Sequence, residues 1–294
     1  QSSLSLKDKI FSIDYILVFS IFILGLISIL AMYSTDGGEV KYHTKSHILR
    51  FFVFFGMFLV LSFIQIRFWH SQSYLLYFLF FILLLGVKYF GLTSSGSKRW
   101  LDLYFMNLQP SELMKIGLIL FLAKYYHRIS IENINKIKFL FLPIVALIAP
   151  LILVATQPDL GTALLIAAGG VTVAWLAGVR VKFFAFSGLA FIALLPIAIS
   201  FLKPYQKSRI LTFLNPERDP LGAGYQIIQS KIAIGSGGLF GKGFLQGSQS
   251  YLDYLPEKHT DFIFTLFSEE FGFFGSLFIL LLYAVIVWRI VKIG

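Results

Sequence analysis

Apolar runs follow one another along most of the chain and are separated by short polar breaks. A helix that crosses a bilayer needs about twenty mostly apolar residues. By that rule the pattern predicts about eight membrane-spanning helices, at residues 13–34, 48–66, 72–90, 111–126, 137–156, 159–178, 181–202 and 271–291. The alternating pattern of membrane barrel strands is not seen, so helices are the expected spanning elements. The sequence therefore predicts an all-α polytopic membrane protein, with one transmembrane domain over residues 1–294.

The apolar pattern is interrupted over residues 203–260, where the chain becomes charged, aromatic and rich in glycine. We expect a large extracytoplasmic loop there, before the last span. The chain then continues as TDFIFTLFSEEFGFFGS, in which Asp261, Glu269 and Glu270 lie among phenylalanines. Carboxylates within an apolar helix are unfavourable in a membrane and usually mark functional positions. Asp261 is the principal candidate for a catalytic residue.

Composition supports a membrane protein, since 57% of the 294 residues are hydrophobic and only 14% are charged. A soluble domain has about a quarter of its residues charged. The net charge of +10 indicates anionic partners, either lipid headgroups or a phosphorylated substrate. The basic residues are scattered between the spans, which argues against nucleic acid. The absence of cysteine from the sequence excludes disulfides, thiol catalysis and thiolate metal sites.

The distribution of lysine and arginine favours an inner N-terminus. We interpret the first apolar run as a membrane helix and not as a signal peptide. The inner side then holds Lys7, Lys9, Arg67, Arg128, Lys136, Lys138, Arg180, Lys182, Arg289 and Lys292. The short outer loops hold Lys41, Lys45, Lys88, Lys98 and Arg99. The 203–260 loop adds seven cations on the outer side, where they are able to hold an anion.

The fourth predicted span is preceded by GSKRWLDLYFMNLQPSELMKIG, in which Ser111 is the expected N-cap. Glu112 and Lys115 are three residues apart and so share a face of this helix. They form either a local ion pair or a polar cluster that projects into a cavity, because Lys115 lies one turn into the apolar run. Arg99, next to Trp100, is by itself a typical headgroup contact.

Other polar residues have simple structural interpretations beside functional ones. Asp159 opens the sixth span as its expected N-cap, and Asp261 is able to cap the last helix. Glu269 and Glu270 lie about two turns beyond Asp261 and could pair with a buried cation. The glycines from Gly235 to Gly243 allow either a flexible loop or a backbone cradle for an anion. No metal cage or Ser–His–Asp arrangement stands out, and the five histidines look dispersed.

Several ordered motifs resemble the SEDS family (shape, elongation, division and sporulation). These motifs are GSKRWLDL, QPSELMK, QPDLGTA, RILTFLNPERDPLGAGYQIIQSKIAIGSGGLFGKGF and LPEKHTDFIFTLFSEEFGFFG. LPEKHTDFIF is more similar to the elongation member of the family, RodA, than to the division member, FtsW. The family has ten spans, whereas eight are predicted here, so we expect the last helical hairpin to be missing from this sequence.

The resemblance implies a peptidoglycan glycosyltransferase that polymerises lipid II on the outer face of the bacterial cytoplasmic membrane, for cell elongation and rod shape. It implies that Asp261 is the catalytic residue and that Glu112 and Lys115 belong to the site. Arg99 and Asp159 are implied as further substrate-binding residues. The implied partners are a class B penicillin-binding protein, which is a transpeptidase, and other membrane proteins of the elongation complex.

Forming a β-1,4 glycan bond from an α-linked diphosphate inverts the anomeric carbon, which requires a general base and positive charge at the leaving group. Asp261 is the expected base. The expected cations are Lys203, Lys207, Arg209, Lys231 and Lys242, together with Arg99 and Lys115. A divalent cation, Mg²⁺ or Mn²⁺, could share this role, with Asp261 or Glu112 as ligands. Two alternative functions remain open, a lipid II flippase and a non-catalytic scaffold for the transpeptidase.

Overall fold

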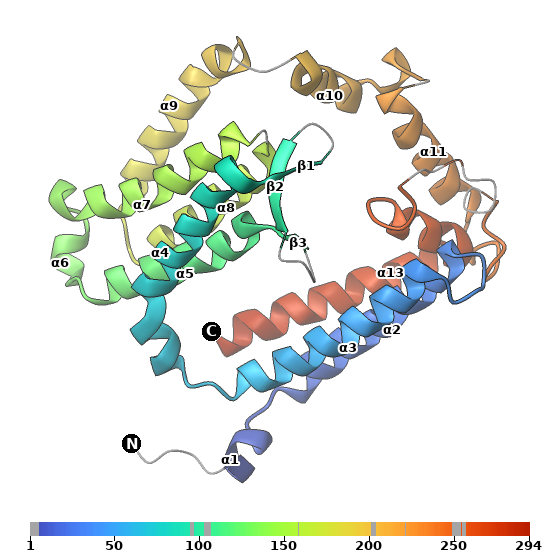
Figure 1. Ribbon diagram of the computed structural model, residues 1–294, viewed down its shortest axis with the longest axis horizontal. Coiled ribbons are helices and arrows are strands. Elements are labelled where there is room, and N and C mark those ends of the chain that lie inside the picture. The colour runs from blue at the N-terminus through green and yellow to red at the C-terminus, as the bar shows by residue number, and fades with distance from the viewer. Residues whose placement is uncertain are drawn as a thin grey trace. The chain divides into compact units, whose positions relative to one another are not determined.

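The computed structural model describes residues 6–94, 97–102, 107–157, 159–200, 204–220, 222–248, 254 and 257–294. The chain is predominantly helical and forms two compact units (Figure 1). Unit 1 consists of Gln1–Phe63 and Ala198–Gly294, and unit 2 consists of Ile64–Ile197.

Each of the eight predicted spans overlaps a helix. These helices are α2 (Tyr15–Thr35), α3 (Tyr42–Ser62), α4 (Ile66–Phe90), α5 (Pro110–His127), α7 (Ile137–Thr156), α8 (Leu160–Leu176), α9 (Val181–Ser200) and α13 (Ile263–Ile293). Among the described residues, five helices are long and apolar enough to cross a membrane, namely α2, α3, α4, α7 and α13. The count of eight spans therefore remains a prediction for α5, α8 and α9.

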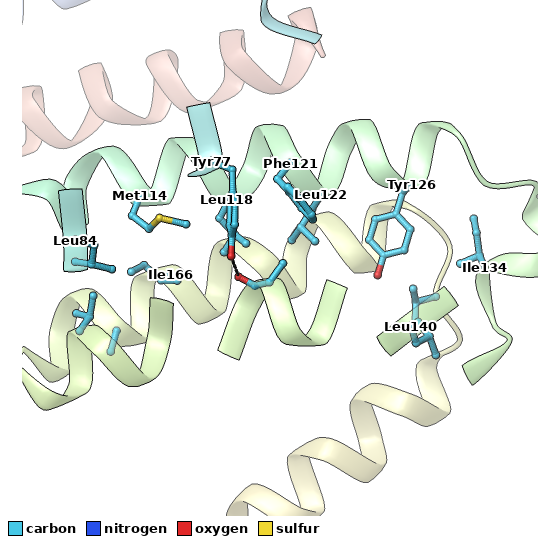
Figure 2. Close-up of a cluster of buried hydrophobic side chains, with 14 residues drawn as sticks. Tyr77, Leu84, Met114, Leu118, Phe121, Leu122, Tyr126, Ile134, Leu140 and Ile166 are labelled. Atoms are coloured by element: carbon cyan, nitrogen blue, oxygen red, sulfur yellow. Dashed lines mark hydrogen bonds between the residues drawn. The ribbon is translucent and has the colours of Figure 1, made fainter. Parts of the chain in front are cut away.

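The core of unit 2 is built around α5, which packs against α4, α7 and α8 (Figure 2). Apolar side chains on α5 recur at helical spacing, and burying them together removes their surface from water or lipid. The large apolar side chains buried on this helix are Met114, Leu118, Phe121, Leu122 and Tyr126. The central helix of unit 2 therefore carries three charged residues, Glu112, Lys115 and Lys124, while its protein neighbours cover its apolar side chains.

Close approach of α4 to α5 depends on a glycine. A Cβ added at Gly117 would lie 2.8 Å from Phe80 Cδ2 and 3.4 Å from Tyr77 Cα. The hydroxyl of Tyr77 donates a hydrogen bond to the Ala146 carbonyl on α7, at 2.8 Å (Figure 2). This bond satisfies a buried hydroxyl that would otherwise weaken the core.

Unit 2 also contains a short helix, α6 (Ile131–Ile134), and a small antiparallel sheet that the apolar pattern did not predict. The sheet has three strands in the order β1 (Leu92–Ser94), β2 (Ser97–Asp102) and β3 (Asn107–Leu108). Leu92 pairs with Trp100, and Leu101 pairs with Leu108. The sheet connects α4 to α5 and places Arg99 on its middle strand.

Unit 1 is organised on α2, which packs against both α3 and α13 (Figure 1). A short helix, α1 (Leu6–Phe11), precedes it. The described part of the predicted 203–260 loop is largely helical, with α10 (Pro204–Leu214), the 3₁₀ helix η1 (Pro216–Arg218) and α11 (Ala223–Ser236). Of these, α11 packs against α13.

Asp14 fastens one end of the α2–α13 pair. Its carboxylate caps α2 by accepting a hydrogen bond from the Leu17 N–H at 3.0 Å, and it accepts another from Arg289 Nε at 2.8 Å. Both hydrogen bonds lower the pKa of Asp14, and the one from Arg289 has the larger effect. The start of α2 is thereby tied to the last turns of α13.

Asp36 performs a similar task at the other end of α2. The side chain of Lys41, the N-cap residue of α3, makes no capping hydrogen bond. Instead, Asp36 accepts hydrogen bonds from the Thr44 N–H at 2.9 Å and from Thr44 Oγ1 at 2.6 Å. Burial acts to raise the pKa of Asp36, but these hydrogen bonds and the neighbouring His259 and His43 outweigh it and lower the pKa.

Replacement of Asp36 by Asn should therefore make stability less dependent on pH. A carboxylate with a lowered pKa stabilises the fold above its unfolded pKa of about 3.9, and this contribution disappears as pH falls through the folded value. At neutral pH we expect a loss of about 1–2 kcal/mol, typical of a lost cap. Thermal unfolding in detergent should show the difference from wild type shrinking below about pH 4. The exposed Glu39, replaced by Gln, is the control, and an equal pH profile for both variants would contradict the assignment.

Candidate active site

Asp261 lies in the turn of residues 257–262, just before α13 in unit 1. The turn is closed by hydrogen bonds from the N–H groups of Thr260 and Phe262 to the Glu257 carbonyl, at 3.2 and 3.3 Å. Phe262, and not Asp261, occupies the N-cap position, and its side chain makes no capping bond. The interpretation of Asp261 as a helix cap is therefore wrong, because the chain makes a turn there before the helix begins.

Asp261 is exposed, and its carboxylate makes no hydrogen bond or ion pair with any part of the chain that the structure describes. Most of the other carboxylates in this part of unit 1 have partners that satisfy them. A solvent-accessible carboxylate without a structural partner keeps its lone pairs available for a ligand. That availability is what a general base requires.

Two residues before Asp261, His259 joins the turn to the ends of α2 and α3. Its Nδ1 lies 2.9 Å from Thr35 Oγ1 and 3.9 Å from Asp36 Oδ1. Its ring stacks on that of His43, with centroids 4.3 Å apart. The expectation of dispersed histidines is thus wrong here, and pairing occurs a second time between His70 and His127, whose centroids lie 5.4 Å apart. Because the partners are distant in sequence, no spacing signal could have revealed them.

A polar pocket of about 680 Å³ opens beside this histidine pair. It is lined by Ser34, Thr35, Asp36, Gly37, Glu39, Lys41, Tyr42, His43, Lys258 and His259. Two lysines are balanced by two carboxylates, so the pocket is polar without being strongly basic. Imidazole, carboxylate and hydroxyl groups of this kind suit a ligand rich in hydroxyls.

An apolar groove of about 370 Å³ lies between α2 and α13. Its α13 residues come after the turn of residues 257–262 in the sequence. Its lining is Leu24, Ile27, Ser28, Ala31, Ile263, Phe264, Phe267, Ile279, Leu280 and Tyr283. Ile263 and Phe264 of the groove lie two and three residues after Asp261, whereas His259 of the polar pocket lies two residues before it. The candidate base therefore stands in the chain between an apolar groove and a polar pocket.

The helix α13 is broken at Gly272, which has φ = 66° and ψ = −160°. Backbone N–H and C=O groups next to the break have no hydrogen-bond partner within α13. The glycine-rich loop of residues 235–243 provides these partners. The Lys242 and Gly243 N–H groups donate to the Glu269 and Glu270 carbonyls, both at 3.0 Å. The loop's Gly238 and Leu239 carbonyls accept from Phe273 and Phe274, at 2.9 and 3.2 Å.

This exchange corrects two predictions. The last span was expected to begin at residue 271, but helical structure begins at Ile263 and is interrupted near the predicted start. The N–H groups of Lys242 and Gly243, which an anion cradle would use, are occupied by helix carbonyls. The loop thus holds the break in place and orients the segment of α13 that follows Asp261.

Glu269 is fully buried and pairs with a cation, as the structural interpretation predicted. Lys242 Nζ lies 2.6 Å from Glu269 Oε1, and Ser248 Oγ donates to the same oxygen at 2.9 Å. Lys242 also donates to Ser248 at 2.7 Å. Lys242 therefore neutralises a buried carboxylate, which argues against its predicted role at a leaving group.

Glu270, only 3% exposed, is held by a different set of partners. It accepts hydrogen bonds from Ser34 Oγ on α2 and from the N–H groups of Leu245 and Gly247 in the loop. Leu245 adopts φ = 63°, the left-handed region that is unfavourable for leucine. The two glutamates of the last span thus fix the loop and α2 to the broken helix.

In unit 2, the predicted residues Arg99 and Asp159 come together. Arg99 Nη1 lies 3.8 Å from Asp159 Oδ2, and Gln109 Nε2 donates to the same oxygen at 3.4 Å. Asp159 also caps α8, since its Oδ1 accepts from the Thr162 N–H at 3.2 Å. The predicted capping role is confirmed, and the same side chain connects β2 with the starts of α5 and α8.

Glu112 and Lys115 form the predicted ion pair, with 2.8 Å between Glu112 Oε2 and Lys115 Nζ. The Glu112 side chain is 53% exposed and that of Lys115 is 26% exposed, so the pair is open to a ligand. Ser111 is not the N-cap as predicted. Gln109 holds that position and Pro110 is the first helical residue, where its missing N–H is tolerated.

The remaining cations predicted for the leaving group come from the 203–260 segment. Lys203 falls outside the described residues, whereas Lys207 and Arg209 lie on α10 and Lys231 lies on α11. The described residues hold no group of three His, Asp or Glu side chains that could bind a metal ion. The Mg²⁺ or Mn²⁺ ion suggested from the sequence, with Asp261 or Glu112 as ligands, therefore stays a prediction.

The family model of FtsW, RodA and SpoVE, described as cell cycle proteins, matches residues 11–294. The chain belongs to this family. It is 44% identical to the peptidoglycan glycosyltransferase MrdB of Escherichia coli over 235 residues, which cover 78% of the chain and 62% of that relative. It is 37% identical to a probable peptidoglycan glycosyltransferase FtsW of Buchnera aphidicola, covering 87% of the chain and 74% of the relative.

A third member of the family, the stage V sporulation protein E of Bacillus subtilis, is 40% identical to this chain. The match covers 77% of this chain and 62% of that relative. Family membership and the apolar helices together identify a multi-pass membrane protein. The chain spans 62% of the Escherichia coli relative's length.

Solved structures support the same fold. One, described as "Structural coordination of polymerization and crosslinking by a peptidoglycan synthase complex", has a TM-score of 0.74 at 28% identity, covering 95% of this chain and 77% of that one. The Thermus thermophilus rod shape determining protein RodA has a TM-score of 0.65 at 23% identity, covering 95% and 74%.

Replacing Gly272 by Ala should destabilise unit 1. A Cβ there would lie 2.3 Å from the Gly241 nitrogen, and a backbone with this positive φ and extended ψ disfavours alanine by about 1–3 kcal/mol. We expect a loss of stability larger than this, measured by thermal unfolding in detergent.

Gly86 on α4 is the matched control for this substitution, because a Cβ there meets nothing within 4 Å. Alanine at position 86 should be neutral or stabilise by up to about 1 kcal/mol. Equal melting temperatures for the two variants would mean that the helix break does not require glycine.

Proposed function

We propose that this protein is a peptidoglycan glycosyltransferase that polymerises lipid II into β-1,4 glycan strands, with Asp261 as general base. The proposal is supported by relatives named peptidoglycan glycosyltransferase. The observation that carries it is the exposed Asp261 carboxylate, which has no partner within the described chain. It lies in sequence between an apolar groove and a polar pocket, an arrangement that suits a substrate with a lipid tail and a sugar head.

The chemistry is a single displacement at the anomeric carbon. The acceptor's 4-hydroxyl oxygen attacks this carbon while Asp261 removes the hydroxyl proton. The bond from the anomeric carbon to the diphosphate oxygen breaks, and undecaprenyl diphosphate leaves with the electron pair. Attack opposite the leaving group converts the α-linked sugar into a β-linked one.

The remaining groups have complementary tasks in this proposal. The polar pocket, with its paired imidazoles and balanced charge, suits the sugar hydroxyls of the acceptor. Arg99 and Lys115 each lie near a carboxylate in unit 2, and their role in binding the diphosphate is proposed from the family resemblance alone. Such pre-placed cations stabilise charge as it develops. Glu112 and Asp159 orient the two cations.

The proposal places the protein in the bacterial cytoplasmic membrane with an inner N-terminus. Asp261 then acts at the outer face, in the region that follows the 203–260 segment. A class B penicillin-binding protein is the proposed transpeptidase partner, alongside other membrane proteins of the elongation complex. The resemblance to a solved peptidoglycan synthase complex supports such a partner.

Replacing Asp261 by Asn should abolish most polymerisation while leaving the fold intact. Loss of a positioned base lowers rates by about 10²–10⁴-fold. The measurement is glycan formation from lipid II by the full-length protein with its transpeptidase partner. Thermal unfolding should match wild type, because the Asp261 carboxylate makes no bond within the described chain.

The control is Glu132→Gln on α6, an exposed carboxylate in unit 2 that should retain full activity. Near-normal polymerisation by folded Asp261→Asn would refute the assignment of the base. Reconstituted protein that moved lipid II between leaflets without forming polymer would instead be a flippase. An intact complex in which wild type forms no glycan would indicate a scaffold.

Exchanging Glu112 and Lys115 tests whether the pair acts on substrate or only on the helix. The variant Glu112→Lys/Lys115→Glu retains an i, i+3 ion pair, so its stability should change by only a few tenths of a kcal/mol. If Lys115 faces the diphosphate, the exchange should lower kcat/KM by about tenfold to a hundredfold, because a charged hydrogen bond is lost. Retained activity would assign the pair to helix stability alone.

A further inference from the structure

A second pocket, of about 480 Å³, lies in unit 2 between the first turns of α4 and the last turns of α5. It is lined by Ile66, Arg67, Trp69, His70, Ser73, Leu120, Ala123, Lys124 and His127. None of these residues has been assigned a part in the proposed glycosyl transfer. The pocket combines four basic side chains with an apolar wall.

The charges around this pocket are all of one sign. Arg67, His70, Lys124 and His127 line the pocket, Arg128 follows His127 in the chain, and no acidic residue is among the lining residues. None of the ion pairs between described residues involves Lys124, His127 or Arg128. Like charges gathered in this way repel one another, and a bound anion relieves the repulsion.

Lys124 shows that the site is built and is not only a basic surface. It is 6% exposed, and its Nζ donates to the Ser71 carbonyl at 2.7 Å and lies 4.6 Å from the centre of the Tyr74 ring. An ammonium group has three donors, and burying it without a carboxylate is unfavourable. His70 Nε2 is also buried and has no hydrogen-bond partner among the described residues.

A simpler explanation is that cations near the end of α5 complement the helix dipole. That explanation fits His127 and Arg128, which lie at the exposed end of the helix. It does not fit Lys124, whose bond goes to a carbonyl of α4. The first turn of α4 contains no acidic residue, and its N-cap Gln65 makes no capping bond, so its positive end adds to the attraction for an anion.

The apolar wall indicates which anion fits. Ile66, Trp69, Leu120 and Ala123 share the pocket with the cations. Tryptophan and basic residues at the end of an apolar helix are typical of the membrane interface, and basic pockets between membrane helices bind anionic headgroups. We propose that this pocket binds the headgroup phosphate of an anionic phospholipid, with Lys124 and His70 as inner donors and Arg67 and His127 at the rim.

Fluorescence of Trp69 provides a direct test, because bromine quenches tryptophan only at close range. The protein carries Trp100→Phe, Trp175→Phe and Trp288→Phe, which leave Trp69 as the reporter. It is reconstituted in vesicles of phosphatidylcholine and phosphatidylglycerol of fixed composition. Bromine is placed on the phosphatidylglycerol or on an equal mole fraction of the phosphatidylcholine. Brominated phosphatidylglycerol should quench Trp69 fluorescence more strongly than brominated phosphatidylcholine does. The expected difference corresponds to phosphatidylglycerol binding about fivefold more tightly for each cation that contacts its phosphate.

Two matched variants locate the effect. Arg67→Gln/His127→Gln changes the two exposed residues at the rim and should remove most of the preference for phosphatidylglycerol. Lys136→Gln/Lys138→Gln removes two basic residues at the start of α7, away from the pocket lining, and should keep it. A protein that retains only Trp175, on α8, should show equal quenching by both lipids. Retention of phosphatidylglycerol by the wild type in native mass spectrometry is a second measurement that needs no substitution.

Equal quenching of Trp69 by the two lipids would overturn the proposal. So would a preference that survives in the rim variant as well as in the control. Millimolar inorganic phosphate shares the headgroup chemistry but lacks acyl chains, and it should leave the difference unchanged. If phosphate abolished the preference, the pocket would be a site for a soluble anion and not for a lipid.

Discussion

The break in α13 at Gly272 is the constraint on which the rest of unit 1 depends. An interrupted helix leaves backbone groups without partners in an apolar setting, where each unpaired group is strongly unfavourable. The glycine-rich loop supplies those partners, and it can approach closely enough only because glycine stands on both sides of the contact. Asp261 lies before the segment of α13 that this loop holds.

The carboxylates of unit 1 differ in whether they have partners within the described chain. Glu269 is neutralised by Lys242, Glu270 is bound by Ser34 and loop amides, and Asp36 is satisfied by Thr44. Each of these acids fastens two elements together. Asp261 alone among these four lacks such a partner in the described chain.

Much of the helical architecture could be predicted because burial in a membrane imposes a simple rule on length and polarity. The helix positions, the Glu112–Lys115 pair and the cap at Asp159 all follow from local spacing. The small sheet around Arg99 and the helices of the 203–260 segment were missed, since short polar elements carry no comparable periodic signal. The N-caps expected at Ser111 and Asp261 were wrong because local backbone geometry decides where a helix begins.

The sequence by itself determined that this is a helical membrane protein of a recognisable family with one outstanding acid near the last helix. Only the tertiary structure decided what surrounds that acid. It joined His43 to His259, assigned Lys242 to Glu269, and gathered the cations of α4 and α5 around one pocket. The physical reason is that such contacts join residues far apart in the chain. Side-chain spacing within one helix carries no information about its neighbours.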